Sequence, residues 1–219
     1  MISMVIRLGM LWLILIAVVP VCLGSVANVV TPYRPIGEGL CWDDSAFPIR
    51  VNLAEVGSIG KIPALDVAGA ARNAMGAWNR ALAGQMFIEG SGPNKVITAP
   101  VGVDAGYVAQ AELQDHDTLI TSFTITVNTS VPFSMNFEGD AEAYDLETVL
   151  VHEFGHVLGL DHPVSDAARV VGTVVAGSEY AVCYIYPGTT RIMCPQGKGK
   201  VMRSPGPDDV TGVKAIYGW

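Results

Sequence analysis

Three histidines and one glutamate in the stretch VHEFGHVLGLDHP (151–163) are the residues best placed to do chemistry. The chain holds only four histidines in 219 residues, and three of them lie between positions 152 and 162. On a helix, His152 and His156 would lie one turn apart on the same face. Two neutral imidazoles at this spacing can bind one zinc ion, so the pattern predicts a metal centre.

Glu153 and His162 supply the remaining parts of such a centre. The carboxylate of Glu153 would lie beside the metal without binding it, where it can accept a proton from an activated water. Gly159 tolerates the left-handed conformation in which helices end, so the chain can reverse there and bring His162 back as a third ligand. Three protein ligands leave a position open for water, as in catalytic rather than structural zinc sites.

The zinc motif is predicted to lie on a helix over residues 144–158, which Asp145 can cap. Apolar residues recur at helical spacing over residues 65–82, so a second long helix is predicted there, with Asp66 as its N-cap. A last short helix is predicted over residues 207–217.

Strands are predicted where apolar and polar residues alternate or β-branched residues cluster. These stretches are residues 47–53, 95–103 and 119–130, and the sequence DHD (115–117) is placed in the loop before the last of them. Strands that alternate with long helices, followed by an irregular tail, favour a single α+β or mixed-sheet domain.

The composition suits one globular domain, with 50% hydrophobic and 16% charged residues. The net charge of −8 argues against nucleic acid as a partner, because a surface that binds phosphates needs a basic excess. The chain also offers no polybasic patch for an anionic membrane surface.

Residues 1–27 have the pattern of a signal peptide. Their apolar run, over residues 8–23, is shorter than the roughly 20 residues that a membrane-spanning helix needs. Small residues favour cleavage after Ala27, with cleavage after Gly24 as the alternative. We therefore expect a secreted, extracellular protein that begins at residue 28, and an uncleaved membrane anchor is the competing interpretation.

The cysteines of an exported protein can form disulfides, because export leads to an oxidising compartment. Cys22 would leave with the signal peptide, and Cys41, Cys183 and Cys194 would remain. Three cysteines allow at most one internal disulfide, and the sequence leaves its pairing open.

The sequence HEFGHVLGLDH resembles the long zinc signature HExxHxxGxxH of the metzincin metallopeptidases, which a Met-turn follows. The wider stretch DLETVLVHEFGHVLGLDHP is similar to the active-site helix of the matrixins, the matrix metalloproteinase branch. Further on, IMCP (192–195) resembles the Met-turn, and PDDVTGVKAIYG (207–218) resembles the closing helix. The resemblance is strong over residues 140–219, weaker over 42–140 and absent before.

The resemblance implies an α+β fold of the zincin type, in which a twisted mixed β-sheet packs on two long helices. A small irregular C-terminal subdomain would hold the Met-turn and the final helix. The catalytic domain would span residues 28–219, with an upper subdomain over 28–159 and a lower one over 160–219. The stretch ITSFTITVNTS (120–130) is similar to the sheet edge that lines the substrate cleft in this family.

The activity implied is that of a zinc endopeptidase with one catalytic Zn²⁺ and protein or peptide substrates. His152, His156 and His162 resemble its zinc ligands, and Glu153 resembles the general base that later acts as an acid.

Supporting roles are implied for residues after the motif. Met193 resembles the Met-turn methionine, a hydrophobic floor beneath the histidines. Pro195 would shape the wall of the specificity pocket, and Gly159 would end the helix. Asp208 or Asp209 would tie the last helix to the active-site region.

The chain also departs from the matrixin pattern. His116 is the one histidine left for a second, structural zinc, so we expect that zinc to be missing. Asp104, Asp115 and Asp117 are candidate ligands for a calcium ion, although acidic loop residues are more often only solvated. No propeptide motif surrounds Cys41, so a disulfide or an inert thiol is favoured there over an inhibitory zinc ligand.

Two other functions are compatible with these residues. One is a binding module that keeps the zinc but cleaves nothing, and the other is a membrane-tethered interaction protein, if residues 8–23 are not removed. The intact Glu153 argues against the first, because a site without catalysis needs no base. Asn128-Thr129-Ser130 also matches the N-glycosylation sequon, which has meaning only in a cell that glycosylates.

Overall fold

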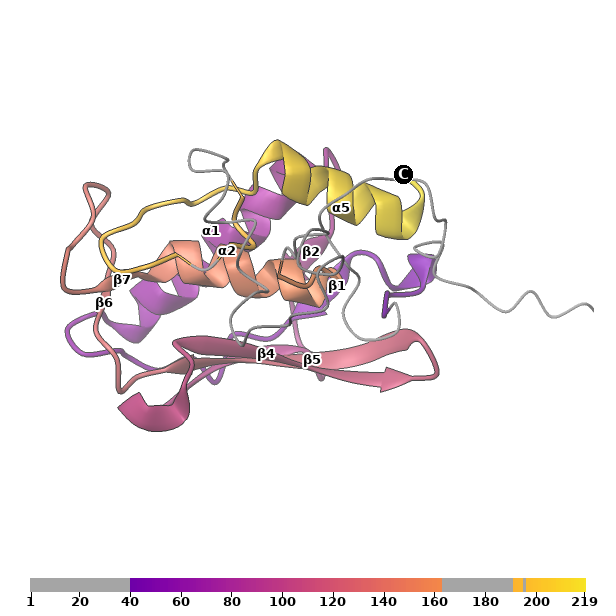
Figure 1. The fold of residues 1–219 in the computed structure, drawn as a ribbon. Helices are drawn as coiled ribbons and strands as arrows, with labels where there is room; N and C mark the ends of the chain where they lie inside the picture. Colours follow the sequence, from indigo (N-terminus) through magenta and orange to yellow (C-terminus); the bar gives the residue numbers. More distant parts are fainter. Residues whose placement is uncertain (1–39, 163–190, 195) are drawn as a thin grey trace, which may run out of the picture.

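The structure, a computed structural model, describes residues 40–162, 191–194 and 196–219. In chain order the elements are η2 (Asp44–Ala46), β1 (Ile49–Val51), α1 (Ala64–Ala81), β2 (Phe87–Glu89), β3 (Lys95–Ala99), η3 (Val103–Ala105), β4 (Ala109–His116), β5 (Leu119–Asn128), β6 (Phe133–Ser134), β7 (Tyr144–Asp145), α2 (Leu146–Val157) and α5 (Pro207–Tyr217). Figure 1 shows α2 between the β4–β5 hairpin and α5. The predicted α+β fold, with a sheet packed on helices, is confirmed.

Strands β1 to β5 form a mixed sheet in which β4 is one edge, and β6 and β7 pair separately. β3 and β5 are parallel, and β4 pairs antiparallel with β5, so the order is β3-β5-β4. β1 and β2 are parallel to each other, and a parallel bridge between Asn52 and Lys95 joins the end of β1 to the start of β3. Across this bridge the strands follow the order β2-β1-β3-β5-β4.

The strand prediction is wrong at two points, and both concern β4. Asp115 and His116 lie at the end of this strand rather than in a loop, and the turn that follows is left to Asp117 and Thr118. β5, whose sequence resembles a cleft-lining sheet edge, is an inner strand, and β4 is the edge instead. β4 is not predicted from the sequence because most of its side chains face solvent and AQAELQDH contains no β-branched residue.

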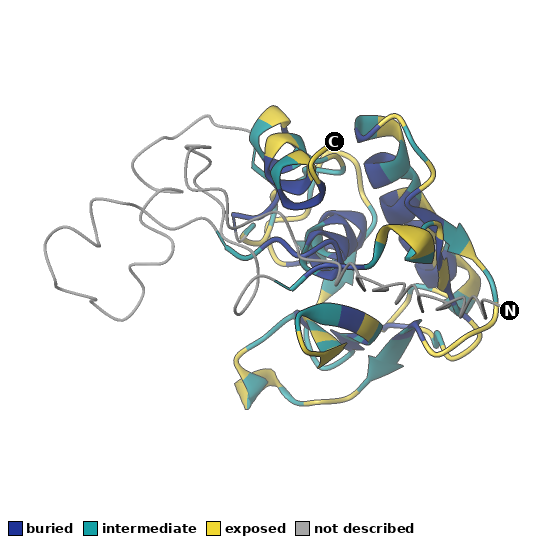
Figure 2. Cartoon of the chain, turned by 90° about the vertical axis from the view of Figure 1, so that its right-hand side faces the viewer, coloured by how far each residue is buried: buried dark blue, intermediate teal, exposed yellow. Residues whose placement is uncertain are grey.

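The core lies between the sheet and the helices. On β5, the buried residues Ile120, Phe123, Ile125 and Val127 all face inward. Phe123 meets Phe154 of α2 edge-on, with ring centroids 6.3 Å apart. Figure 2 shows the buried positions gathered where the helices and the sheet face one another.

α1 approaches α2 closely because its inner face is built from small residues. Ala70, Ala71 and Ala74 have no exposed surface. Trp78 fills the volume at the end of this face, and its Nε1–H donates to the carbonyl oxygen of Val151 at 2.8 Å. This contact fixes the helix that carries the histidines against the core.

The start of α1 differs from the prediction, whereas α2 begins as predicted. Pro63 is the N-cap of α1 and makes no side-chain cap bond, so Asp66 is not the cap but lies in the first turn, where it still favours the helix dipole. Asp145 caps α2: its Oδ1 accepts from Thr148 N at 2.8 Å and from Thr148 Oγ1 at 2.6 Å. α5 spans the predicted residues 207–217.

Cys41 and Cys194 are both disulfide-bonded, which is one of the two states expected for Cys41. Cys183 lies outside the described residues, as do residues 1–27 with the predicted signal peptide. In the part of the chain that the structure describes, no helix has the length and apolar character needed to cross a membrane. The division into upper and lower subdomains stays a prediction.

Candidate metal centre

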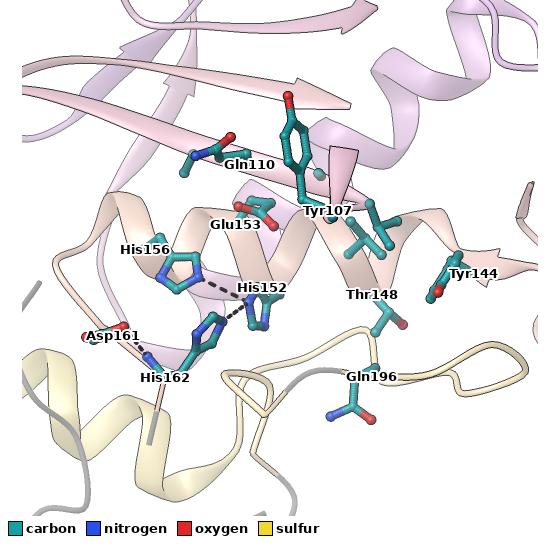
Figure 3. Close-up of a pocket in the computed structure, with 15 residues that line it drawn as sticks. Tyr107, Gln110, Tyr144, Thr148, His152, Glu153, His156, Asp161, His162 and Gln196 are labelled. Carbon is teal, nitrogen blue, oxygen red and sulfur yellow. Dashed lines mark hydrogen bonds between the residues drawn. The ribbon is translucent and has the colours of Figure 1, made fainter. Parts of the chain in front are cut away.

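His152, His156 and His162 point their Nε2 atoms toward a common centre (Figure 3). The Nε2 atom of His152 lies 3.0 Å from that of His162 and 3.1 Å from that of His156. The potential ligand atoms of the three residues all lie within 4.8 Å of one another. The structure therefore brings together the three predicted ligands, two from α2 and one from the segment after it.

The second nitrogen of two of these rings is held by a backbone carbonyl. His152 Nδ1 lies 2.8 Å from Ile192 O, and His156 Nδ1 lies 2.7 Å from Leu160 O. A carbonyl oxygen only accepts hydrogen bonds, so Nδ1 carries the proton in both rings. The Nε2 atoms of both rings then present bare lone pairs, which repel each other and cannot form a hydrogen bond.

A cation between the nitrogens relieves this repulsion. Tetrahedral zinc, with Zn–N bonds of about 2.0–2.1 Å, separates its ligand atoms by about 3.3 Å, which is close to the observed separations. Burial lowers the pKa of His152 well below its usual range and the pKa of His156 to about 4, and neighbouring imidazoles add to both shifts. Both rings are therefore neutral at pH 7, as metal ligands must be. The donor set fits zinc.

Glu153 lies on the side of α2 that faces β4 (Figure 3). The residue is 5% exposed, and its carboxylate accepts a hydrogen bond from the backbone N–H of Ala111 on β4. Burial raises the pKa of Glu153 to about 8, and the bond from Ala111 opposes the shift only in part. A cation held by the histidines would lower this pKa, because it stabilises the charged carboxylate.

The turn after α2 returns the chain to the metal centre at His162. α2 ends at Val157, and Gly159 follows with a φ of 90°, which L side chains rarely adopt. A Cβ at Gly159 would also lie 2.7 Å from the carbonyl oxygen of Leu40. Glycine at this position thus allows both the reversal and the close approach of the backbone at Leu40.

Two aromatic side chains hold the carbonyl groups at the end of α2. Trp42 Nε1 donates to Val157 O at 2.8 Å, and the hydroxyl of Tyr217 donates to Leu158 O at 3.3 Å. These carbonyls would otherwise lack helical partners. Neither role is predictable from the zinc motif, because Trp42 and Tyr217 lie far from it along the chain.

Met193 packs beneath the metal centre against α2. It has no exposed surface, and a Cβ at Gly155 would overlap its sulfur atom and lie 3.1 Å from Trp78 Cζ2. The two segments therefore approach each other at Gly155 more closely than any other residue allows. This places Met193 where the sequence resemblance implies a hydrophobic floor.

Asp209 anchors the segment of Met193 to α5. The residue is completely buried, and its Oδ2 accepts from Ile192 N at 2.8 Å and from Gly206 N at 2.6 Å. Asp208 forms an ion pair with Arg191, with 2.6 Å between Oδ2 and Nη2. Both aspartates thus tie the last helix to the active-site region, a role predicted for one or the other.

A cleft of about 480 Å³ opens between β4 and α2 and contains the metal centre. Several of its lining residues were not expected from the sequence, because they come from separate elements and meet only in the folded chain. Away from the histidines and Glu153, the polar lining residues are Tyr107, Gln110, Tyr144, Thr148, Asp161 and Gln196 (Figure 3).

Two further predictions concern Pro195 and the candidate calcium ligands. Pro195 lies outside the described residues. Asp104 lies in η3, before β4, whereas Asp115 and Asp117 lie at the opposite end of that strand. The three aspartates therefore do not form one calcium site, and the described residues hold no acidic cluster that groups them.

In a comparison with protein-family models, residues 59–179 match the matrixin family. The matched region is more than half of the chain. It contains α1, β2 to β7, and α2 with the three histidines.

Replacing Gly155 by alanine should destabilise the protein by about 1–3 kcal/mol, because the new methyl group overlaps Met193 and forces the segments apart. Gly69→Ala is the matched control in α1, where no described atom lies within 4 Å of the added Cβ. It should stabilise the protein by about 0.5–1 kcal/mol, because alanine favours a helix. Urea unfolding measures both changes, and equal effects would contradict the close approach at Gly155.

Proposed function

The chain belongs to the matrixin family, and we propose that it is a zinc-dependent endopeptidase that uses Glu153 as its general base. The family implies metalloendopeptidase activity on proteins or peptides. The observation that carries the proposal is the convergence of three imidazole nitrogens beside a buried carboxylate in an open cleft. Three histidine ligands leave one coordination position for water.

Glu153 moves the proton in the proposed reaction. Zinc bound at the histidines supplies Lewis acidity, which activates water and polarises the scissile carbonyl. Glu153 takes a proton from the attacking water and then donates it to the leaving amine. Glu153 is buried beside the three histidines, where a carboxylate can hold this proton between the two steps.

The edge of β4 supports the binding of an extended peptide. β4 has β5 on one side only, so its outer backbone groups face the cleft over residues 109–111. A peptide that pairs with this edge gains main-chain hydrogen bonds without a requirement for a particular side chain. Such a peptide would lie beside Glu153 and the histidines, which line the same cleft.

We also propose that the protein is exported. Disulfide bonds at Cys41 and Cys194 fit an oxidising compartment, and the apolar run over residues 8–23 has the length of a signal-peptide core. Mass spectrometry of protein from the culture medium should find a chain that begins at residue 28, or at 25 if cleavage follows Gly24. A cell-bound chain that retains residues 8–23 would support the membrane-tethered alternative.

Zinc binding should depend on His162 and not on His116. His162→Ala removes one of three ligands, so zinc affinity should fall by about 100-fold or more. His116→Ala removes an exposed histidine far along β4 and should retain one zinc per chain. Elemental analysis after dialysis against a competing chelator measures both. Zinc retained by both variants, or lost from both, would refute the assignment.

Glu153→Gln should retain zinc while peptide cleavage slows by about 10²–10⁴-fold, because the amide cannot accept the proton of water. Glu142→Gln makes the same change in charge at an exposed residue and should cleave at the wild-type rate. Quenched fluorescent peptides measure the rates, and a zinc chelator should abolish wild-type cleavage. A folded, zinc-loaded wild type that cleaves nothing would instead favour the binding-module alternative.

A further inference from the structure

The segment between β3 and β4, residues 100–108, forms part of the cleft wall and is called the cleft loop below. Gly106, Tyr107 and Val108 line the cleft, and they lead into the residues of β4 that line it as well. Val103, in the middle of the loop, is 69% exposed, so apolar packing contributes little to holding the loop in place. Its position must come mainly from hydrogen bonds.

Asn128, the last residue of β5, supplies two of these bonds with one side chain. Its Nδ2 donates to Gly102 O at 2.7 Å and to Tyr107 O at 3.2 Å. Its Oδ1 accepts from Ser130 N at 3.0 Å, and the residue has no exposed surface. The amide thus joins two points of the cleft loop that are five positions apart and uses both of its hydrogens to do so.

The backbone around Asn128 holds the same loop. Asn128 N donates to Val108 O at 3.0 Å, which starts the pairing of β4 with β5. Ser130 Oγ accepts from Gly102 N at 3.0 Å. The carbonyl of Gly102 is therefore bound by the last residue of β5, and its amide by a residue that follows the strand.

These bonds also bear on the glycosylation sequon at Asn128. A glycan would replace one of the two Nδ2 hydrogens, and both donate to carbonyl groups inside the protein. A fully buried amide offers no room for a sugar. In this fold the side-chain amide of Asn128 binds the cleft loop and is not available for glycosylation.

We propose that Asn128 is a positioning residue for the substrate cleft, because its amide holds the cleft loop and Tyr107 in place. The effect on substrate rests on the proposed peptidase function, whereas the anchoring of the loop does not. Asn128 is not among the described residues that line the cleft. Its loss should therefore weaken substrate binding more than the chemical step.

Asn128→Asp tests the anchoring of the loop most directly. Aspartate keeps the size of the side chain and the acceptor for Ser130 N, but it loses both donors. Its second oxygen would face the carbonyl oxygens of Gly102 and Tyr107, which repel it. Ser130→Ala removes only the bond to Gly102 N and provides a milder variant if the aspartate variant does not fold.

Asn94→Asp is the matched control. Asn94 is also buried, at 8% exposed, and its Nδ2 donates to Arg50 O at 3.1 Å. Its Oδ1 accepts from Phe123 N, also at 3.1 Å. The substitution thus removes a comparable buried amide clamp that holds strands β1 and β5 and lies outside the set of cleft-lining residues.

Hydrogen–deuterium exchange of the purified protein measures the anchoring directly. Amides over residues 102–110 should exchange about tenfold faster or more in Asn128→Asp, and less so in Ser130→Ala, because their opening no longer breaks these bonds. Exchange in α1 should stay unchanged, and Asn94→Asp should leave the cleft loop as in the wild type. Unchanged exchange of the loop in both Asn128→Asp and Ser130→Ala would overturn the proposal.

Peptide cleavage separates positioning from a general loss of structure. Asn128→Asp should raise KM by about tenfold and keep kcat within about threefold, whereas Asn94→Asp should change neither. A loss of kcat at unchanged KM would overturn the positioning role. If the wild type cleaves no peptide, the proposed function fails, and the exchange measurement still decides whether Asn128 anchors the loop.

Discussion

The site depends on holding three imidazole rings together although their nitrogens repel. The Nε2 atom of His152 lies 3.0 and 3.1 Å from those of the other two rings, and burial disfavours the protonation that would let one nitrogen donate to another. Two of the rings, those of His152 and His156, are therefore fixed from outside by the carbonyl groups of Ile192 and Leu160, which accept their Nδ1 protons. Ligands held in this way need no rearrangement when a metal binds, which is the usual contribution of such outer contacts to affinity.

The carbonyl group of Ile192 is fixed by contacts between segments far apart in the chain, and that of Leu160 by a local contact at the end of α2. Ile192 is held by its N–H bond to Asp209 at the start of α5, and by its neighbour Met193, which fits against Gly155. Leu160 is held by the bond from its own N–H to the carbonyl oxygen of Gly155 at 3.1 Å. Gly155 of α2 thus helps to fix the carbonyl groups of both Ile192 and Leu160. α5 matters to the metal centre for the same reason, although it carries no ligand.

The sequence predicts those parts of the site that depend on neighbours along the chain. The spacing of His152 and His156, the cap at Asp145 and the reversal at Gly159 are local consequences of helix geometry, and the structure shows all three. The long helices are predictable for the same reason. The sequence does not predict the edge strand β4 or the lining residue Tyr107. A strand at an edge is half solvated and loses the apolar alternation, and a cleft wall is defined only by which segments meet across it.

The edge of β4 lacks features that prevent strand pairing only along the cleft, where a peptide can bind. An unpaired edge can recruit another sheet, and proteins usually prevent this with charges or irregularities. β4 has both beyond the cleft: exposed carboxylates at Glu112 and Asp115, and a register shift between Gln114 and Asp115. Over residues 109–111 these features are missing, but α2 packs against β4 and the cleft between them is only about 480 Å³. That space fits a single extended chain better than the edge of a second sheet, so strand pairing is directed toward a peptide beside Glu153.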